Sequence, residues 1–512
     1  MFKKLIYTIG IAGICGLLYS ATAIAQKSKN TVRIGYYDPI SMVDAVYDPK
    51  PETGLTTRVV YDNLVGFDRN TGEFKPLLAK SWKRIDPRTI EFKLRTDIKF
   101  HDGSDFDADD VVYTINWLAD PKVKFRIKSR YFWISKAVKI DRYTVRVLSK
   151  RPQASALMRL ALSTNIYPSD VHSKLKVKST FGRNGIGTGP YKIVSVDPNK
   201  GVILEKNPGY KHGGPWKPAG KVNRVHLVPI PETQTQIAQL LIGGLDMMYR
   251  VPKDQLADLR KDKRFKATVV NGQLYYYMAI DSIGKSGHPA LKDKRVRKAL
   301  MMAINRDGIR KNLIPGGDKL PSQDAMCYRW QKGCGYSTKP PSYNPEAARR
   351  LLVDSGFGKG FDVNITSTLP SVIPEAVAGD LRKIGVKATI SRLTFPAYRK
   401  KQRSGKIQIL VNQWASGGLA DVQSTVNFFH GKSPRNYYGD KIISKTLITG
   451  EAQFDDKKRR EVYKVAFDRN NTEFYMMPIT PNPPTFLHDK DLSIVGGETD
   501  TFGASIVGLS WK

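Results

Sequence analysis

A strand–helix–strand pattern over residues 363–390 constrains the fold of this chain more than any other feature. Apolar residues alternate with other residues in two short segments, at Val363 and Ile365 and at Val386, Ala388 and Ile390. Between these segments, Val377, Leu381 and Ile384 recur at helical spacing, and Gly385 ends the helix. Two strands joined through a helix pair in parallel, with a right-handed crossover. The pattern therefore predicts an α/β region in the second half of the chain.

Other segments predict antiparallel strands and capped helices. Asp107 and Asp110 have the spacing of a capping box. Asn344 and Gly356 bracket a second helix, and a third is expected from Asp293. Apolar and polar residues alternate after turns in two further segments, which is typical of hairpins in a half-exposed sheet: Ile90, Phe92 and Leu94; Tyr143, Val145 and Val147. The fold class is therefore a mixed α/β and α+β one.

The chain is too long for one small core. It has 512 residues, of which 41% are hydrophobic, so we expect more than one lobe. Lys and Arg number 83 against 47 Asp and Glu, which gives a net charge of +36. A charge of this size favours acidic partners, such as anionic solutes or an anionic membrane surface.

The first residues have the pattern of a secretory signal peptide. A basic start at Lys3 and Lys4 precedes an apolar run, and Ala23-Ile24-Ala25 provides a cleavage site. The apolar run is shorter than the about 20 residues that span a bilayer. We therefore expect residues 1–25 to be removed and the mature chain to be exported.

Export changes the interpretation of the cysteines. Cys15 lies in the signal segment, which leaves Cys327 and Cys334, seven positions apart. An oxidising compartment favours a disulfide between them. The histidines lack ligand spacing to one another or to this pair, so no metal site is expected: His101, His172, His212, His226, His288, His430 and His488.

The chain lacks the common catalytic and cofactor motifs. There is no G-x-G-x-x-G after a strand, no Walker A lysine, no H-E-x-x-H and no G-x-S-x-G. The glycine-rich stretch 182–189 has no lysine for a phosphate and is interpreted as a crossing between lobes. We therefore expect neither an enzyme nor a cofactor. A nucleic-acid binder is the remote alternative, because the basic residues are spread along the chain instead of clustered.

Several segments together resemble one family. Residues 100–114 (FHDGSDFDADDVVYT) are similar to the F-x-D-G-x-x-F-x-A-x-D-V-x-Y-[ST] signature of family 5 extracellular solute-binding proteins, the peptide and nickel receptors of ABC importers. Further matches follow in order: YDNLV at 61–65, LLAKSW at 77–82, GTGPY at 187–191, LEKNPGY at 204–210, VRKA at 296–299, AINR at 303–306 and YNPEAA at 343–348.

The resemblance implies a two-lobed periplasmic-binding-protein fold with an extra inserted lobe and hinge closure. Lobe I would comprise residues 26–61, 186–284 and 481–512, lobe II residues 62–185, and lobe III residues 285–480. Strands near 275–280 and 479–485 would form the hinge. The implied function is capture of a peptide or peptide-like solute by a monomer, which delivers it to the permease subunits. A receptor for an opine, oligosaccharide, metal chelate or haem remains the alternative.

The resemblance also proposes ligand-binding residues. Peptide-binding members present a Trp, matched here by Trp414, and three residues later an Asp that pairs with the peptide α-amino group. Gly417 occupies that second position, beside Ser416. Asp421 either compensates from a shifted loop or corresponds to a later, structural acid. Recognition of an ordinary free-amine peptide is therefore in question.

Three tyrosines complete the predicted site. Tyr275 and Tyr277 should point to one side of the expected hinge strand and Tyr276 to the other. Contact with ligand and packing in the core are equally compatible with this pattern. Tyr36 follows the first mature strand, where family members line their cleft.

Overall fold

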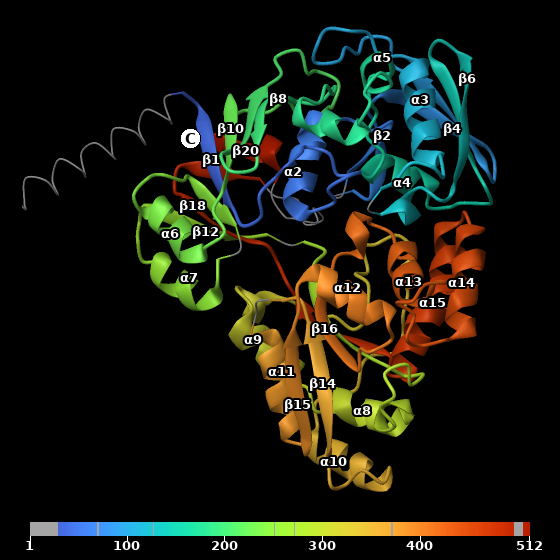
Figure 1. Cartoon of the computed structure of the whole chain (residues 1–512), viewed down its shortest axis with the longest axis vertical. Coiled ribbons are helices and arrows are strands. Elements are labelled where there is room, and N and C mark those ends of the chain that lie inside the picture. The colour runs from blue at the N-terminus through green and yellow to red at the C-terminus, as the bar shows by residue number, and fades with distance from the viewer. Residues whose placement is uncertain are drawn as a thin grey trace, which may run out of the picture. The chain divides into compact units, whose positions relative to one another are not determined.

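The computed structural model describes residues 29–68, 71–125, 127–249, 251–270, 272–369, 372–495 and 505–512. The expected signal segment, with Cys15, lies outside these residues. The chain divides into two compact units, which Figure 1 shows with the elements labelled. Unit 1 consists of Met1–Arg151, Arg159–Asn271 and Pro484–Lys512, and unit 2 of Pro152–Met158 and Gly272–Pro483.

Unit 1 contains a mainly antiparallel sheet. Its described strands number seven and follow the order β12 (Phe265–Val269), β18 (Thr485–Asp489), β11 (Met247–Tyr249), β1 (Thr31–Tyr36), β10 (Arg224–Pro229), β9 (Gly201–Lys206) and β8 (Tyr191–Asp197). β1 pairs in parallel with both β10 and β11, and the other pairs are antiparallel. Apolar residues of α6 (Thr233–Leu241) and α7 (Lys253–Leu259) share a core with this sheet.

A second sheet of unit 1 confirms the predicted hairpins. It is antiparallel, in the order β4 (Ala79–Asp86), β5 (Thr89–Leu94), β7 (Thr144–Ser149) and β6 (Ile134–Asp141). Helix α3 (Ala108–Ala119) packs on it and begins with the predicted capping box between Asp107 and Asp110. Its apolar face, Val111, Ile115 and Leu118, is buried because that face lies against the sheet.

Shorter elements complete unit 1. They are α2 (Pro51–Val60), the hairpin of β2 (Val65–Asp68) and β3 (Glu73–Pro76), η1 (Lys128–Arg130), α5 (Ser169–His172), η2 (Lys178–Arg183), η6 (Ile506–Gly508), and the pair β19 (Leu492–Ile494) and β20 (Leu509–Trp511). Helix α4 (Ala156–Leu162) begins in unit 2 and ends in unit 1.

Unit 2 is built on a mixed sheet. Its described strands follow the order β15 (Val386–Arg392), β14 (Phe361–Ser367), β16 (Ile409–Trp414), β13 (Tyr275–Ile280) and β17 (Met476–Pro481). β14 is parallel to β15 and β16, whereas β13 is antiparallel to β16 and β17. Helix α11 (Ile373–Arg382) connects β14 to β15, and Figure 1 shows it beside them. The predicted βαβ unit is therefore confirmed.

Both faces of this sheet are covered. One core includes residues of α8 (Lys294–Met302), α9 (Arg306–Leu313), α10 (Pro345–Asp354) and α11. The other includes residues of α12 (Phe395–Arg403), α13 (Gln423–His430), α14 (Lys441–Glu451) and α15 (Asp456–Thr472). Short turns η3 (Ala290–Lys292), η4 (Gly317–Lys319) and η5 (Ser416–Gly418) lie between these elements in sequence. The sheet can be apolar on both sides because helices exclude water from each.

Local sequence signals account for several helix ends in unit 2. Asn344 caps α10 by accepting a hydrogen bond from the backbone of Ala347, and Asp293 caps α8 in the same way. Gly356 follows α10 with a φ of +83°, a conformation that glycine adopts without strain. Both predicted helices are confirmed.

The predicted disulfide is confirmed. Cys327 and Cys334 form a bond of 2.02 Å, with their Cα atoms 6.0 Å apart. Both residues are buried in the core of unit 2 that faces α12 to α15. The short loop that they close is therefore anchored to that core.

Candidate functional site

Trp414 is the last residue of β16, shortly before the glycine-containing turn η5. The strand continues to this residue because Trp414 pairs with Tyr275 of β13. Its indole Nε1–H donates a hydrogen bond of 2.9 Å to Thr425 Oγ1. The half-buried ring packs on Phe428 and Phe429 of α13, with centroid distances of 4.2 and 5.3 Å. Trp414 thus belongs to an aromatic cluster at the end of a strand.

Ser416 and Gly417 lie in η5, directly after this strand. Ser416 has a φ of +51°, in the left-handed region that a non-glycine residue seldom adopts. Its buried hydroxyl accepts a hydrogen bond of 2.8 Å from Gln331 Nε2, and its carbonyl accepts one of 2.7 Å from the Ser424 hydroxyl. These bonds hold the turn that follows Trp414 in one conformation.

Asp421 is part of a buried ion pair. Its carboxylate accepts hydrogen bonds of 2.8 and 2.9 Å from Arg459 of α15, and the same guanidinium donates one of 2.9 Å to Glu451. The three side chains are at most 7% exposed. Burial lowers the pKa of Arg459, but the two carboxylates outweigh it and hold that pKa well above its ordinary value. This geometry supports the structural alternative for Asp421.

Glu451 connects this ion pair to the segment 152–158 of unit 2. Its carboxylate accepts hydrogen bonds from the backbone and the hydroxyl of Ser155, at 3.2 and 2.6 Å, and from the Gln153 amide. The Ala154 backbone donates to the Glu451 carbonyl at 2.9 Å. A continuous buried polar network therefore runs from Asp421 to the segment 152–158.

The tyrosines of β13 alternate as predicted. Tyr275 and Tyr277 are buried in the core beside α12 to α15, whereas Tyr276 packs against the opposite core. The Tyr275 hydroxyl donates to the carbonyl of Met326 at 2.7 Å. Burial raises the pKa of Tyr275 and Tyr277 well above 10, so both stay neutral. Their burial favours packing, and ligand contact by either residue stays a prediction.

Tyr36 ends β1 in unit 1, whereas the other six predicted residues belong to unit 2. It is 4% exposed, and burial followed by the nearby charge of Glu52 raises its pKa well above 10. The neighbouring Tyr37 is half-buried, and its hydroxyl lies 2.9 Å from that of Thr233. A joint site of Tyr36 with the residues of unit 2 stays a prediction.

Sequence reasoning missed the residues that surround Trp414. Phe428 packs against it with the rings tilted by 36°, and the guanidinium carbon of Arg435 lies 4.4 Å from the centre of the Phe428 ring. Burial, and after it the charges of Arg399 and Arg403 of α12, lower the pKa of Arg435. The adjacent Phe428 and Phe429 were the available sequence signal, but nothing in the sequence places Arg435 beside them.

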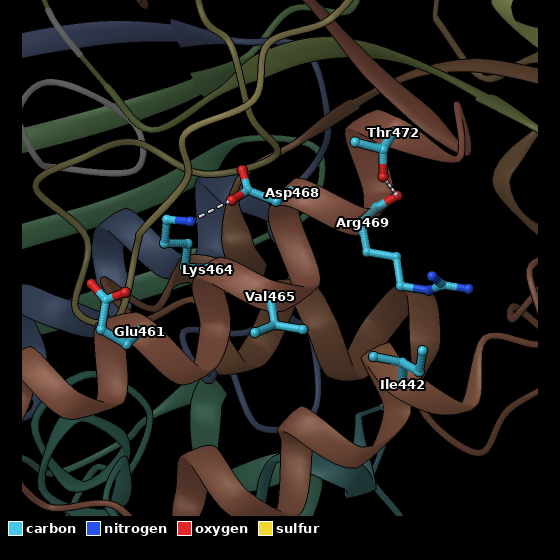
Figure 2. Close-up of a pocket in the computed structure, with 7 residues that line it drawn as sticks. All are labelled: Ile442, Glu461, Lys464, Val465, Asp468, Arg469 and Thr472. Carbon is cyan, nitrogen blue, oxygen red and sulfur yellow. Dashed lines mark hydrogen bonds and ion pairs between the residues drawn. The ribbon is translucent and has the colours of Figure 1, made fainter.

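An open groove lies elsewhere on unit 2, between α14 and α15, and Figure 2 shows its side chains. It has a volume of about 420 Å³ and is lined by Ile442, Glu461, Lys464, Val465, Asp468, Arg469 and Thr472. Lys464 and Asp468 point toward each other and form an ion pair of 2.8 Å (Figure 2). None of the predicted ligand-binding residues lines this groove.

Neither a membrane span nor a metal cluster is found in the part of the chain that the structure describes. No helix there is long and apolar enough to cross a bilayer. No group of three or more His, Cys, Asp or Glu in the same residues could hold a metal ion.

Comparisons with known proteins agree with the fold. The glutathione-binding protein GsiB of Shigella flexneri serotype 5b is 25% identical over 509 residues, which cover 94% of each chain. DppA of Helicobacter pylori, solved with the peptide STSA, is 22% identical with a TM-score of 0.79 over 94% of this chain and 98% of that one. NikA of Brucella suis, solved with Fe(III)-EDTA, is 21% identical with a TM-score of 0.81 over 94% and 100%.

The family model of bacterial extracellular solute-binding proteins, family 5, middle region, matches residues 73–436. This stretch includes the signature at residues 100–114 and the loop after Trp414, and it spans most of the chain. The relatives that match along nearly the full length are binding proteins and not enzymes. The chain therefore belongs to family 5 of the bacterial extracellular solute-binding proteins.

Proposed function

We propose that this chain is the periplasmic substrate-binding component of an ABC importer and captures a peptide or peptide-like organic solute. The family match over residues 73–436 carries this proposal. It is supported by the full-length similarity to a glutathione-binding protein and by the fold shared with a peptide-bound DppA. The permease subunits of the importer would receive the solute.

The mature protein would act without catalysis, as a monomer of three lobes with the boundaries given above. Its first 25 residues would be cleaved on export. Closure of two lobes about the strands β13 and β17 would trap the solute, because the chain passes between units near the ends of these strands. The positive charge would also favour an anionic membrane surface as a place of encounter.

A non-peptide ligand is the second candidate, and one observation favours it. Gly417 stands where the resemblance predicts the carboxylate for a peptide amine, and the nearby Asp421 is already paired with Arg459. An ammonium at this position would therefore lack a free anionic partner. An opine, an oligosaccharide, a metal chelate or haem would not need one.

Mass spectrometry of the exported protein, purified without unfolding, tests the proposal. We expect a folded complex of one chain with one small solute, which is released intact when the protein is denatured. A peptide or peptide-like mass would identify the first class, and another organic mass would identify the second. Protein that never carries or binds a small solute would contradict the proposed function.

A further inference from the structure

Three arginines of unit 2 have no carboxylate partner among the described residues, and the charges of two of them act on the third. They are Arg399 and Arg403 of α12 and Arg435, in the loop between α13 and α14. Among the described residues, no salt bridge joins any of the three to an Asp or Glu; Arg399 donates to the Gln402 side chain at 3.1 Å. The positive charge is therefore not neutralised within the described chain.

The positive charge of Arg435 is partly buried, and a buried charge is usually paired with an opposite one. Its side chain is half-buried, and its guanidinium stacks over Phe428 with the carbon 4.4 Å from the ring centre. Burial, followed by the repulsion from Arg399, lowers the pKa of Arg435 to about 10, so the residue is still charged at neutral pH. The charges of two other arginines thus act on Arg435, and its guanidinium donates no hydrogen bond to another residue in the described part of the chain.

The buried Arg459 of the same unit is neutralised in the usual way, by carboxylates. Its guanidinium is paired with both Asp421 and Glu451. Arg435 has no such carboxylate among the residues that the structure describes, although packing on Phe428 fixes its position. A purely structural role would need neither the charge nor the two neighbouring arginines.

Arg435 is connected to Trp414, the residue before the predicted ligand loop, through Phe428. The Phe428 ring lies 4.2 Å from the Trp414 ring and also contacts the Arg435 guanidinium. Within one unit, the fold therefore combines a flat aromatic surface with a fixed, charged hydrogen-bond donor. Arginine presents paired N–H groups that match a carboxylate or a phosphate.

We propose that Arg435, together with Arg399 and Arg403, binds an oxyanion group of the captured solute beside Trp414. This inference rests on the proposed function and specifies it: the solute is anionic and carries a carboxylate or a phosphate. The replacement of the amine-binding acid by Gly417 fits this charge, because a carboxylate at that position would repel an anionic solute. The high net charge of the protein would attract the same class of solute.

Matched pairs of charged and neutral probes test the inference on the exported protein. Glutathione is compared with its diethyl ester for carboxylate recognition, and glycerol 3-phosphate with glycerol for phosphate recognition. Calorimetric titrations use the wild type, Arg435→Gln, Arg435→Lys and the control Lys445→Gln, which removes an exposed charge of α14. Melting curves of each variant verify folding.

We expect one anionic probe to bind at least about tenfold more tightly than its neutral partner. Arg435→Gln should abolish this preference without lowering the melting temperature, because it also relieves repulsion from Arg399 and Arg403. Arg435→Lys should retain part of the preference, since the charge remains but the paired donors are lost. Lys445→Gln should bind like the wild type.

The inference is overturned if Arg435→Gln keeps the preference for the anion, or if neither anion saturates the wild type by about 1 mM. A co-purified solute that carries no negative charge would also overturn it, and would leave the proposed function intact. Failure of the proposed function is distinguished by the absence of any bound solute in the native mass measurement.

Discussion

Replacement of Asp421 by Asn should destabilise unit 2 substantially. The Asp421 carboxylate accepts two charge-assisted hydrogen bonds from Arg459 and one of 2.9 Å from the backbone of Gln423. Asn keeps one oxygen acceptor but removes the charge and one acceptor, and Glu451 alone must then neutralise the guanidinium. Breaking a buried pair typically costs about 3–5 kcal/mol, and because Glu451 remains we expect about 3 kcal/mol.

Hydrogen-exchange mass spectrometry suits this measurement, because it follows opening of α15 separately from the rest of the chain. Asp421→Asn should lower the free energy of opening of α15 by about 3 kcal/mol. Asp258→Asn is the matched control, because its pair with Lys261 is exposed and should leave protection unchanged. In an Arg459→Met background, Asp421→Asn should cost much less, since the carboxylate then lacks its partner.

Unchanged protection of α15 in Asp421→Asn, together with loss of solute binding, would refute this reasoning. It would mean that Asp421 serves the ligand and that its pair with Arg459 contributes little to folding. Loss of protection with unchanged solute affinity is the expected combination.

Three further changes have expected outcomes. Trp414→Ala should weaken solute binding by about 2 kcal/mol or more in calorimetry, and unchanged affinity of the folded variant would remove Trp414 from the site. Reduction of the bond between Cys327 and Cys334 should lower unfolding free energy by about 2–3 kcal/mol, whereas two free thiols found by alkylation of non-reduced protein would contradict the disulfide. Burial raises the pKa of Asp44 from 3.8 to about 6. The contribution of its protonated carboxyl to the free energy of unfolding is therefore complete below about pH 4 and is lost as pH rises through 6. Asp44→Asn should therefore gain about 3 kcal/mol relative to the wild type between about pH 4 and pH 7 in urea unfolding, and a pH-independent difference would contradict this.

Features that depend on neighbouring residues could be predicted from the sequence. The cap at Asp107, the bracket of Asn344 and Gly356, and the βαβ unit each depend on a short stretch of chain, where spacing determines which groups meet. The alternation at Tyr275 and Tyr277 follows from strand geometry in the same way.

Features that depend on distant residues could not be predicted. Asp421 meets Arg459 across 38 positions, and neither the pairing nor its burial leaves a local signal. Trp414 continues a strand because β13 lies beside it, although its own neighbours suggest a turn. The position of Arg435 on Phe428 likewise depends on how the loop after α13 returns.

Capture of an unaltered solute is tested most directly by calorimetric titration of refolded protein with the solute recovered from the native complex. We predict saturable binding of one solute per chain, with the solute recovered chemically unchanged afterward. Conversion of the solute to a product, or no saturation by about 1 mM in folded protein, would contradict a role as a solute-binding component of an importer.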